Sequence, residues 1–135
     1  MSQQEQLRRS YITLHLPASP AVGAGQATLI ATHPMRIIGA QLTLSDTGTG
    51  AGATTVAVNQ NGTALATSAA LSVAQGAATK ATKVTFLGTT QNYPGGERVN
   101  IGDTITVDVT AVPATTAPKA AAVILSVVQT RHLRP

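Results

Sequence analysis

The chain has 135 residues, of which 43% are hydrophobic but only 2% aromatic, so it fits one domain whose core is mainly Val, Ile, Leu and Ala. It contains no cysteine, which excludes disulfides and thiolate metal sites. Its net charge is +4, but the basic residues are scattered and few aromatics accompany them, so we do not expect direct nucleic-acid binding.

Short stretches that alternate apolar and polar residues, separated by Gly, Pro and Asn, run along the whole chain. This period of two is typical of strands with one buried and one solvent-facing side. The clearest example follows the Gly102-Asp103 turn, where Ile105, Val107 and Val109 alternate with polar residues. In chain order the expected strands are Tyr11–Leu16, Ala27–Thr32, Arg36–Leu44, Thr54–Gln60, Thr63–Thr67, Lys83–Leu87, Thr104–Thr110 and Ala120–Thr130.

Two of these segments carry more specific expectations. In Arg36–Leu44, Ile38 should face the core together with the alanine and leucines at 40, 42 and 44, and Gly39 indicates a bulge or a close packing point. Ala120–Thr130 is almost continuously apolar, which predicts a strand that is central in its sheet or buried on both faces.

Turn residues set the connections between the strands. Asn61-Gly62 favours a tight type I′ hairpin, because both residues tolerate positive φ. The Gly-rich segment 46–53 is expected to be a flexible tip, and 88–98 a loop with a Tyr-Pro-Gly-Gly turn. Residues 69–73 fit either a strand or a short helical turn.

About eight short strands without a convincing helix predict an all-β, single-domain antiparallel β-sandwich, best matched by an eight-stranded jelly roll. The sandwich is expected over residues 11–130. Residues 1–10 are a polar N-terminal arm and residues 131–135 a basic C-terminal tail, and both arms should become ordered only against a partner. The N-terminal residues lack a secretory signal, and the longest apolar run is too short for a bilayer. We therefore expect synthesis in a cytoplasm and no membrane partner.

No set of residues predicts catalysis, and we expect neither an enzyme nor a cofactor. The glycines at 48, 50 and 52 lack the Lys-Ser/Thr of a phosphate-binding loop. The three histidines have no metal-ligand spacing, and no serine lies in a nucleophile elbow. Asp103 most plausibly binds local backbone amides and shapes its turn. A calcium site that uses Asp46 or Asp103 with loop carbonyls remains an alternative.

Four segments together resemble the small jelly-roll proteins of tailed-bacteriophage virions, in particular head decoration (cement) proteins and fibre modules. They are Ile37–Leu44, Thr55–Leu65, Val99–Val109 and Ala122–Val128. The resemblance implies a homotrimer on the capsid surface that binds the major capsid protein and stabilises the virion head.

The arms are the expected contact regions, because polar arms can lie across neighbouring subunits and become ordered on binding. The predicted partner-binding residues are Gln3, Gln4, Leu7, Arg8, Arg9, Arg131, His132 and Arg134. The alternative function is a glycan-binding fibre or lectin-like module that uses loops 46–53 and 88–98 with Tyr93, although such sites usually contain more aromatic side chains.

Overall fold

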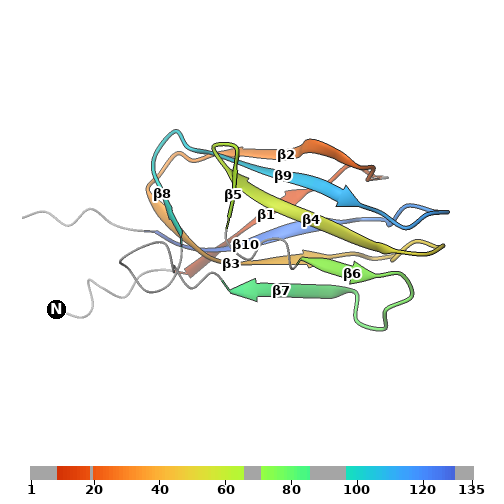
Figure 1. Ribbon diagram of the computed structural model, residues 1–135. Coiled ribbons are helices and arrows are strands. Elements are labelled where there is room, and N and C mark those ends of the chain that lie inside the picture. Colours follow the sequence, from red (N-terminus) through yellow and green to blue (C-terminus); the bar gives the residue numbers. More distant parts are fainter. Residues whose placement is uncertain (1–8, 19, 66–70, 86–96, 130–135) are drawn as a thin grey trace, which may run out of the picture.

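A computed structural model describes residues 9–18, 20–65, 71–85 and 97–129. These residues form an all-β structure of two antiparallel sheets packed face to face, without a helix in the described part (Figure 1). The predicted all-β, sandwich-like architecture is confirmed at this level. The strands are β1 Arg9–His15, β2 Gly23–Ile30, β3 Met35–Thr43, β4 Ala53–Gln60, β5 Thr63–Ala64, β6 Ser72–Ala74, β7 Ala81–Thr85, β8 Glu97–Val99, β9 Thr104–Ala111 and β10 Ala122–Gln129.

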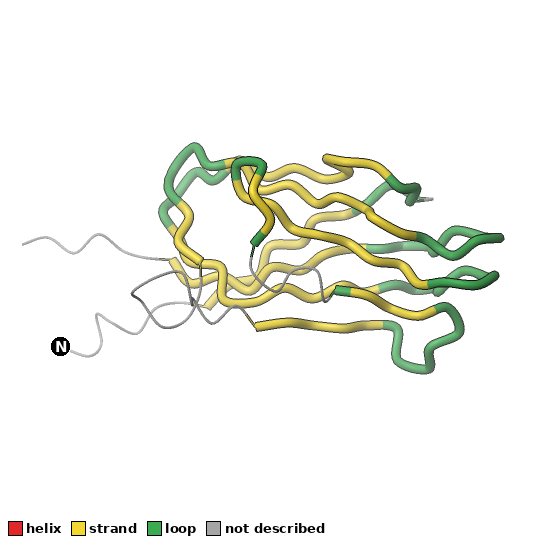
Figure 2. Tube along the Cα trace, viewed as in Figure 1, coloured by secondary structure: helices red, strands yellow, loops and turns green. Residues whose placement is uncertain are grey.

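The two sheets divide the strands in an interleaved order. Sheet A has the order β1-β10-β3-β7, and β8 also pairs with β3; sheet B has the order β2-β9-β4-β5, and β6 also pairs with β4. The first and last strands are neighbours, with Arg9 opposite Val128. Loops gather at the two ends of the sandwich (Figure 2). We call the end with Arg9 and the turn before β9 the terminal end, and the end with segments 45–52 and 112–121 the loop end.

The alternation in the sequence places aliphatic side chains between the sheets. In β9, Ile105, Val107 and Val109 have relative exposures of 0%, 0% and 1%, as predicted. β10 lies between β1 and β3, which confirms its predicted central position. It buries Val123, Leu125 and Val127 and leaves the alternate side chains half-buried, so only one of its faces is in the core. Each fully buried aliphatic side chain contributes about 1.5–3 kcal/mol to stability.

A bulge in β3 changes which isoleucine is buried. Ser126 pairs with Gly39 and the next residue, Val127, pairs with Ile37, so Ile38 is the extra residue. The predicted bulge is confirmed, but the predicted burial of Ile38 is wrong. Ile37 is 0% exposed and Ile38 is half-buried, because one inserted residue reverses the inside-outside alternation of everything before it.

Most strand boundaries lie within a few residues of the prediction. The hairpin between β4 and β5 is confirmed, with φ of 52° at Asn61 and 85° at Gly62. β1 begins at Arg9, two residues before its predicted start. Segment 72–74 is strand β6 rather than a helical turn, and β8 at 97–99 was expected to be mostly loop. The remainder of predicted strand 63–67, Phe86 and Tyr93 lie outside the described residues.

At the loop end, the glycine-rich segment 46–52 packs against segment 112–120. The N–H of Thr49 donates to the carbonyl of Thr116 at 3.1 Å, and the N–H of Thr116 donates to that of Thr49 at 3.0 Å. Gly48 has φ of 80°, and a Cβ at this position would collide with the carbonyl oxygen of Thr116. Segment 46–52 is therefore bonded to a second loop, because its glycines let the two loops approach closely.

Candidate partner-binding site

The residues considered for chemistry are dispersed over the structure. Asp46 lies at the loop end, where its Oδ1 accepts the N–H of Gly48 at 2.9 Å, whereas Asp103 lies at the terminal end. His15 and His33 are both exposed, on β1 and on the β2–β3 turn respectively, and His132 is outside the described residues. Among the residues that the structure describes, no group of three or more His, Cys, Asp or Glu side chains could hold a metal ion.

Asp103 organises the turns at the terminal end. Its carboxylate accepts the Asn100 N–H at 2.9 Å, the Asn61 Nδ2 at 3.0 Å and the Gln60 Nε2 at 2.9 Å. The Thr104 N–H in turn donates to Asn61 Oδ1 at 2.9 Å. These donors, with the Asn100 backbone N–H first, lower the pKa of Asp103 below its ordinary value. The predicted role in shaping the turn is confirmed, and the bonds extend further, to the β4–β5 hairpin.

Asp108 fixes a second irregularity on the outer side of sheet B. Its Oδ1 accepts the N–H of Gly25 at 2.8 Å and its Oδ2 accepts Asn59 Nδ2 at 2.6 Å. Gly25 lies where the register between β2 and β9 shifts. The carboxylate therefore binds a backbone amide at the bulge of β2 and connects β2 with β4 across β9.

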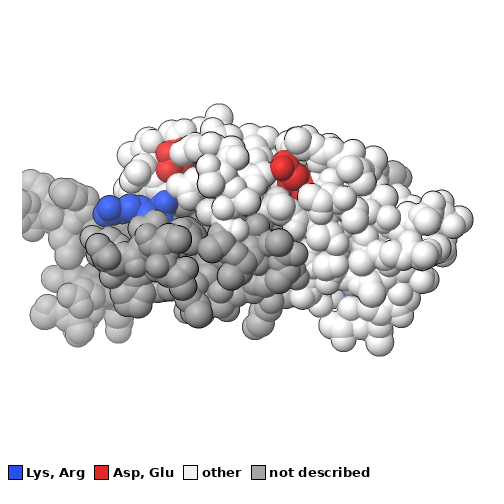
Figure 3. Space-filling view, in the orientation of Figure 1, with Lys and Arg blue, Asp and Glu red and all other residues white. Residues whose placement is uncertain are grey.

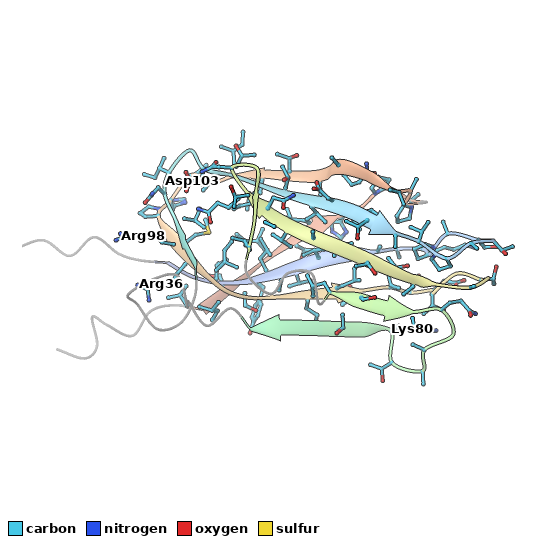
Figure 4. The ribbon with its side chains drawn as sticks, in the orientation of Figure 1. Arg36, Lys80, Arg98 and Asp103 are labelled. Atoms are coloured by element: carbon cyan, nitrogen blue, oxygen red, sulfur yellow. The ribbon has the colours of Figure 1, made fainter. Side chains whose placement is uncertain are left out.

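Strand register brings three arginines into one row at the terminal end of sheet A. Arg9 pairs with Val128, Val128 with Arg36, and Arg36 with Arg98, so the row crosses β1, β10, β3 and β8. Arg36 is half-buried and Arg98 is exposed, while their neighbours in sequence, such as Val99, are buried, which places both arginines on the outer face of the sheet. In Figure 4 both lie at the terminal end, far from Lys80.

This row places three basic residues at the terminal end, where Glu97 of β8 and Asp103 also lie. Figure 3 shows Lys or Arg side chains at this end, with acidic atoms above them. The outer face also carries apolar surface, because Tyr11 is 64% exposed and Val128 is half-buried in the row itself. Arginine and aromatic side chains are both enriched at the contact points of protein interfaces. We take this arginine row, Arg9, Arg36 and Arg98, as the candidate binding site.

One of the predicted partner-binding residues belongs to this row. Arg9 lies in the row, whereas the other predicted residues, in 1–8 and 130–135, are outside the described residues. Arg36 and Arg98 were missed, since they are far apart in the sequence and neither stands in a basic run. A correct register for β3 would have been needed to find them, and the bulge at Ile38 hides it.

The two loops of the glycan-binding alternative do not converge in the described part of the structure. Segment 46–52 is at the loop end, bonded to segment 112–120, whereas Arg98 is at the terminal end. Tyr93 itself lies outside the described residues. The structure thus gives no shared surface for those loops within the residues it describes.

Comparison with known proteins adds no relative to these observations. No protein-family model, curated protein or solved structure matches the chain. In the described residues, no helix is long and apolar enough to cross a membrane.

Proposed function

We propose that this chain is a jelly-roll structural protein of a virion. The strand order supports the jelly roll: sheet A alternates strands from the first and second halves of the chain, and in sheet B the late strand β9 lies between the early strands β2 and β4, as two interleaved Greek keys would require. On this interpretation β5 and β6 form one interrupted strand along β4, and β7 and β8 form one along β3, which gives eight strands in all.

The function we propose is non-enzymatic: a capsid decoration protein that binds the major capsid protein and stabilises the virion head, as a homotrimer. The observation that supports it is the terminal end, where the arginine row lies beside the entry to β1 and the exit from β10. The segments that continue from there, 1–8 and 130–135, carry further arginines at 8, 131 and 134. A basic end from which both arms start can contact several subunits of a shell at once.

The direct test is sedimentation with genome-filled particles that lack this protein. We expect wild type to co-sediment and to saturate at a fixed ratio to the main shell subunit. Deletion of residues 1–8 should weaken binding and leave the sandwich folded, because β1 begins at Arg9. Failure of the wild-type protein to bind the particles would refute the proposed function.

A pair of matched double variants tests the role of the arginine row. Arg36→Gln with Arg98→Gln removes two positive charges at the terminal end, and Lys80→Gln with Lys119→Gln removes two at the loop end. We expect the first pair to weaken particle binding and the second to leave it nearly unchanged. The wild-type affinity should also fall with added salt, since the Debye length shrinks from about 10 Å at 0.1 M to about 3 Å at 1 M. Equal effects of the two pairs would contradict the assignment of the binding end.

A further inference from the structure

We propose that the outer edge of β1, which pairs with no other strand among the described residues, binds an extended segment of the shell partner as an added strand, with an acidic side chain of that segment beside Arg9. This inference rests on the proposed function and adds to it the binding mode and the chemistry of the partner. It starts from the direction of the backbone groups of β1.

Every second residue of β1 points its backbone N–H and C=O away from the sheet. The N–H of Leu16 donates to the carbonyl of Ala121 at 3.0 Å, which marks these two residues as a hydrogen-bonded pair. Such pairs alternate along antiparallel strands, so even-numbered residues of β1 bond to β10. The backbone groups of Arg9, Tyr11, Thr13 and His15 therefore point to the open edge.

Among the described residues, the other sheet edges are interrupted in ways that β1 is not. β2 has a register shift between Gly23 and Ala27, where Asp108 binds the Gly25 N–H. The far edge of sheet B is made by β5 and β6, which have only two and three residues. β7 carries Lys83, and lysine is a typical protecting residue of edge strands.

β1, in contrast, offers seven residues in unbroken register and no charged residue after Arg9. Natural proteins usually protect such an edge, because it is a template for pairing with another chain. Its outward side chains, among them Tyr11 with 64% exposure, would flank the side chains of an added strand. Recognition by strand addition takes its affinity from main-chain hydrogen bonds and its specificity from alternate side chains.

Arg9 favours an acidic residue in the added segment. Arg9 occupies the β1 position of the row that continues through Val128 to Arg36 and Arg98. A strand added to β1 would place one of its residues next to Arg9, whereas Arg36 and Arg98 lie two and three strands further into the sheet. Opposite charges directly across adjacent strands attract and like charges repel, so an acidic residue is favoured there. A peptide edge and a single exposed Tyr favour an acidic protein segment over a nucleic acid, which would need stacking side chains.

Proline substitution separates edge binding from fold stability. Thr13→Pro removes an N–H that points to the open edge of β1 and leaves the bonds to β10 in place. Thr28→Pro is the matched control on β2: the Ala31 N–H donates to the Asp103 carbonyl at 2.9 Å, so the N–H of Thr28 also points away from its sheet. Both threonines are exposed.

With genome-filled particles lacking the protein as the probe, we expect Thr13→Pro to weaken binding by about tenfold or more and Thr28→Pro to change it by less than about twofold. Thermal unfolding of each variant checks the fold. If Thr13→Pro does not fold, hydrogen exchange of the wild type decides: the outward-pointing amides of residues 11, 13 and 15 should exchange more slowly on the particle, and those of residues 28 and 30 should not change. Equal binding by the two variants, or unchanged exchange in 11–15, would overturn the inference while wild-type binding still supports the proposed function.

Two further results would also overturn the inference. A duplex DNA fragment that slows exchange in 11–15 and competes with the particles would identify a nucleic-acid site. Loss of self-association in Thr13→Pro by analytical ultracentrifugation, without loss of particle binding, would assign the edge to a second copy of this chain. Failure of wild type to bind particles at all refutes the proposed function first, so the two failures are distinguishable.

Discussion

Replacing Asp103 by alanine should loosen the terminal end of the sandwich and reduce the stability of the whole domain. The substitution removes the acceptor of three hydrogen bonds, from Gln60, Asn61 and the Asn100 backbone. A buried bond to a charged group contributes about 1.5–3 kcal/mol, but these donors lie at a partly exposed turn and can bind water instead. We therefore expect a total loss of about 1–2 kcal/mol, or about 4–8 °C in Tm for a chain of this size.

The effect of this substitution should depend on pH in a defined direction. Because hydrogen bonds lower the pKa of Asp103 in the folded state, its carboxylate stabilises the fold above the pKa of the unfolded chain. That contribution is lost as the pH falls from the unfolded-state value, about 3.9, through the lower folded-state value. Asp103→Asn keeps the shape of the side chain and removes its charge. At neutral pH it should therefore lower the free energy of unfolding by less than Asp103→Ala does.

Urea unfolding of wild type and both variants at pH 7 and at steps below pH 4 measures these differences. The difference in the free energy of unfolding between wild type and Asp103→Ala should become smaller as the pH falls. A variant as stable as wild type at pH 7, or a gap that stays constant to the lowest pH, would refute the role assigned to Asp103.

Two pairs of substitutions test other features of the fold. Thr54 is 0% exposed and its hydroxyl has no hydrogen-bond partner among the described residues, so Thr54→Val should stabilise the protein by about 1 kcal/mol. Thr47→Val should destabilise it by a similar amount, about 1 kcal/mol, because Thr47 Oγ1 accepts the N–H of Gly76 at 2.9 Å. A change of the same sign in the free energy of unfolding of both threonine variants, measured in urea, would contradict this reasoning. Gly48→Ala should cost about 2 kcal/mol or more, since it adds a collision with Thr116 to an unfavourable φ, whereas Gly76→Ala, with open space around it, should cost about 1 kcal/mol. Equal thermal shifts for the two glycine variants would show that the loop contact is not needed.

The sequence was sufficient for the features that depend on local patterns. Alternation identified β9 and its buried side, and Asn61-Gly62 identified the hairpin, because both signals are complete within a few residues. The turn role of Asp103 was also predictable from its place after Gly102. The hydrogen bond between the β4–β5 hairpin and Asp103 could not be predicted, since it joins segments that are distant in the chain.

Other features depended on which strands become neighbours. Which side chains of β3 face the core before the bulge could not be predicted from the residues of β3 alone. The position of the bulge is set by pairing with β10. Segment 46–52 has the composition of a flexible loop, and only contact with segment 112–120 holds it. β8 has three residues, too few for a periodic signal, and it is a strand because β3 offers it an edge.

The sequence by itself determined an all-β chain with an aliphatic core and no recognisable catalytic set, because composition and period-two alternation are local properties. Only the tertiary structure placed Arg9, Arg36 and Arg98 in one row and made β1 the outermost strand of its sheet among the described residues. The physical reason is that strand register and sheet order arise from hydrogen bonds between residues far apart in the chain. Charges that appear scattered along the sequence can therefore form one surface at the end of a sheet.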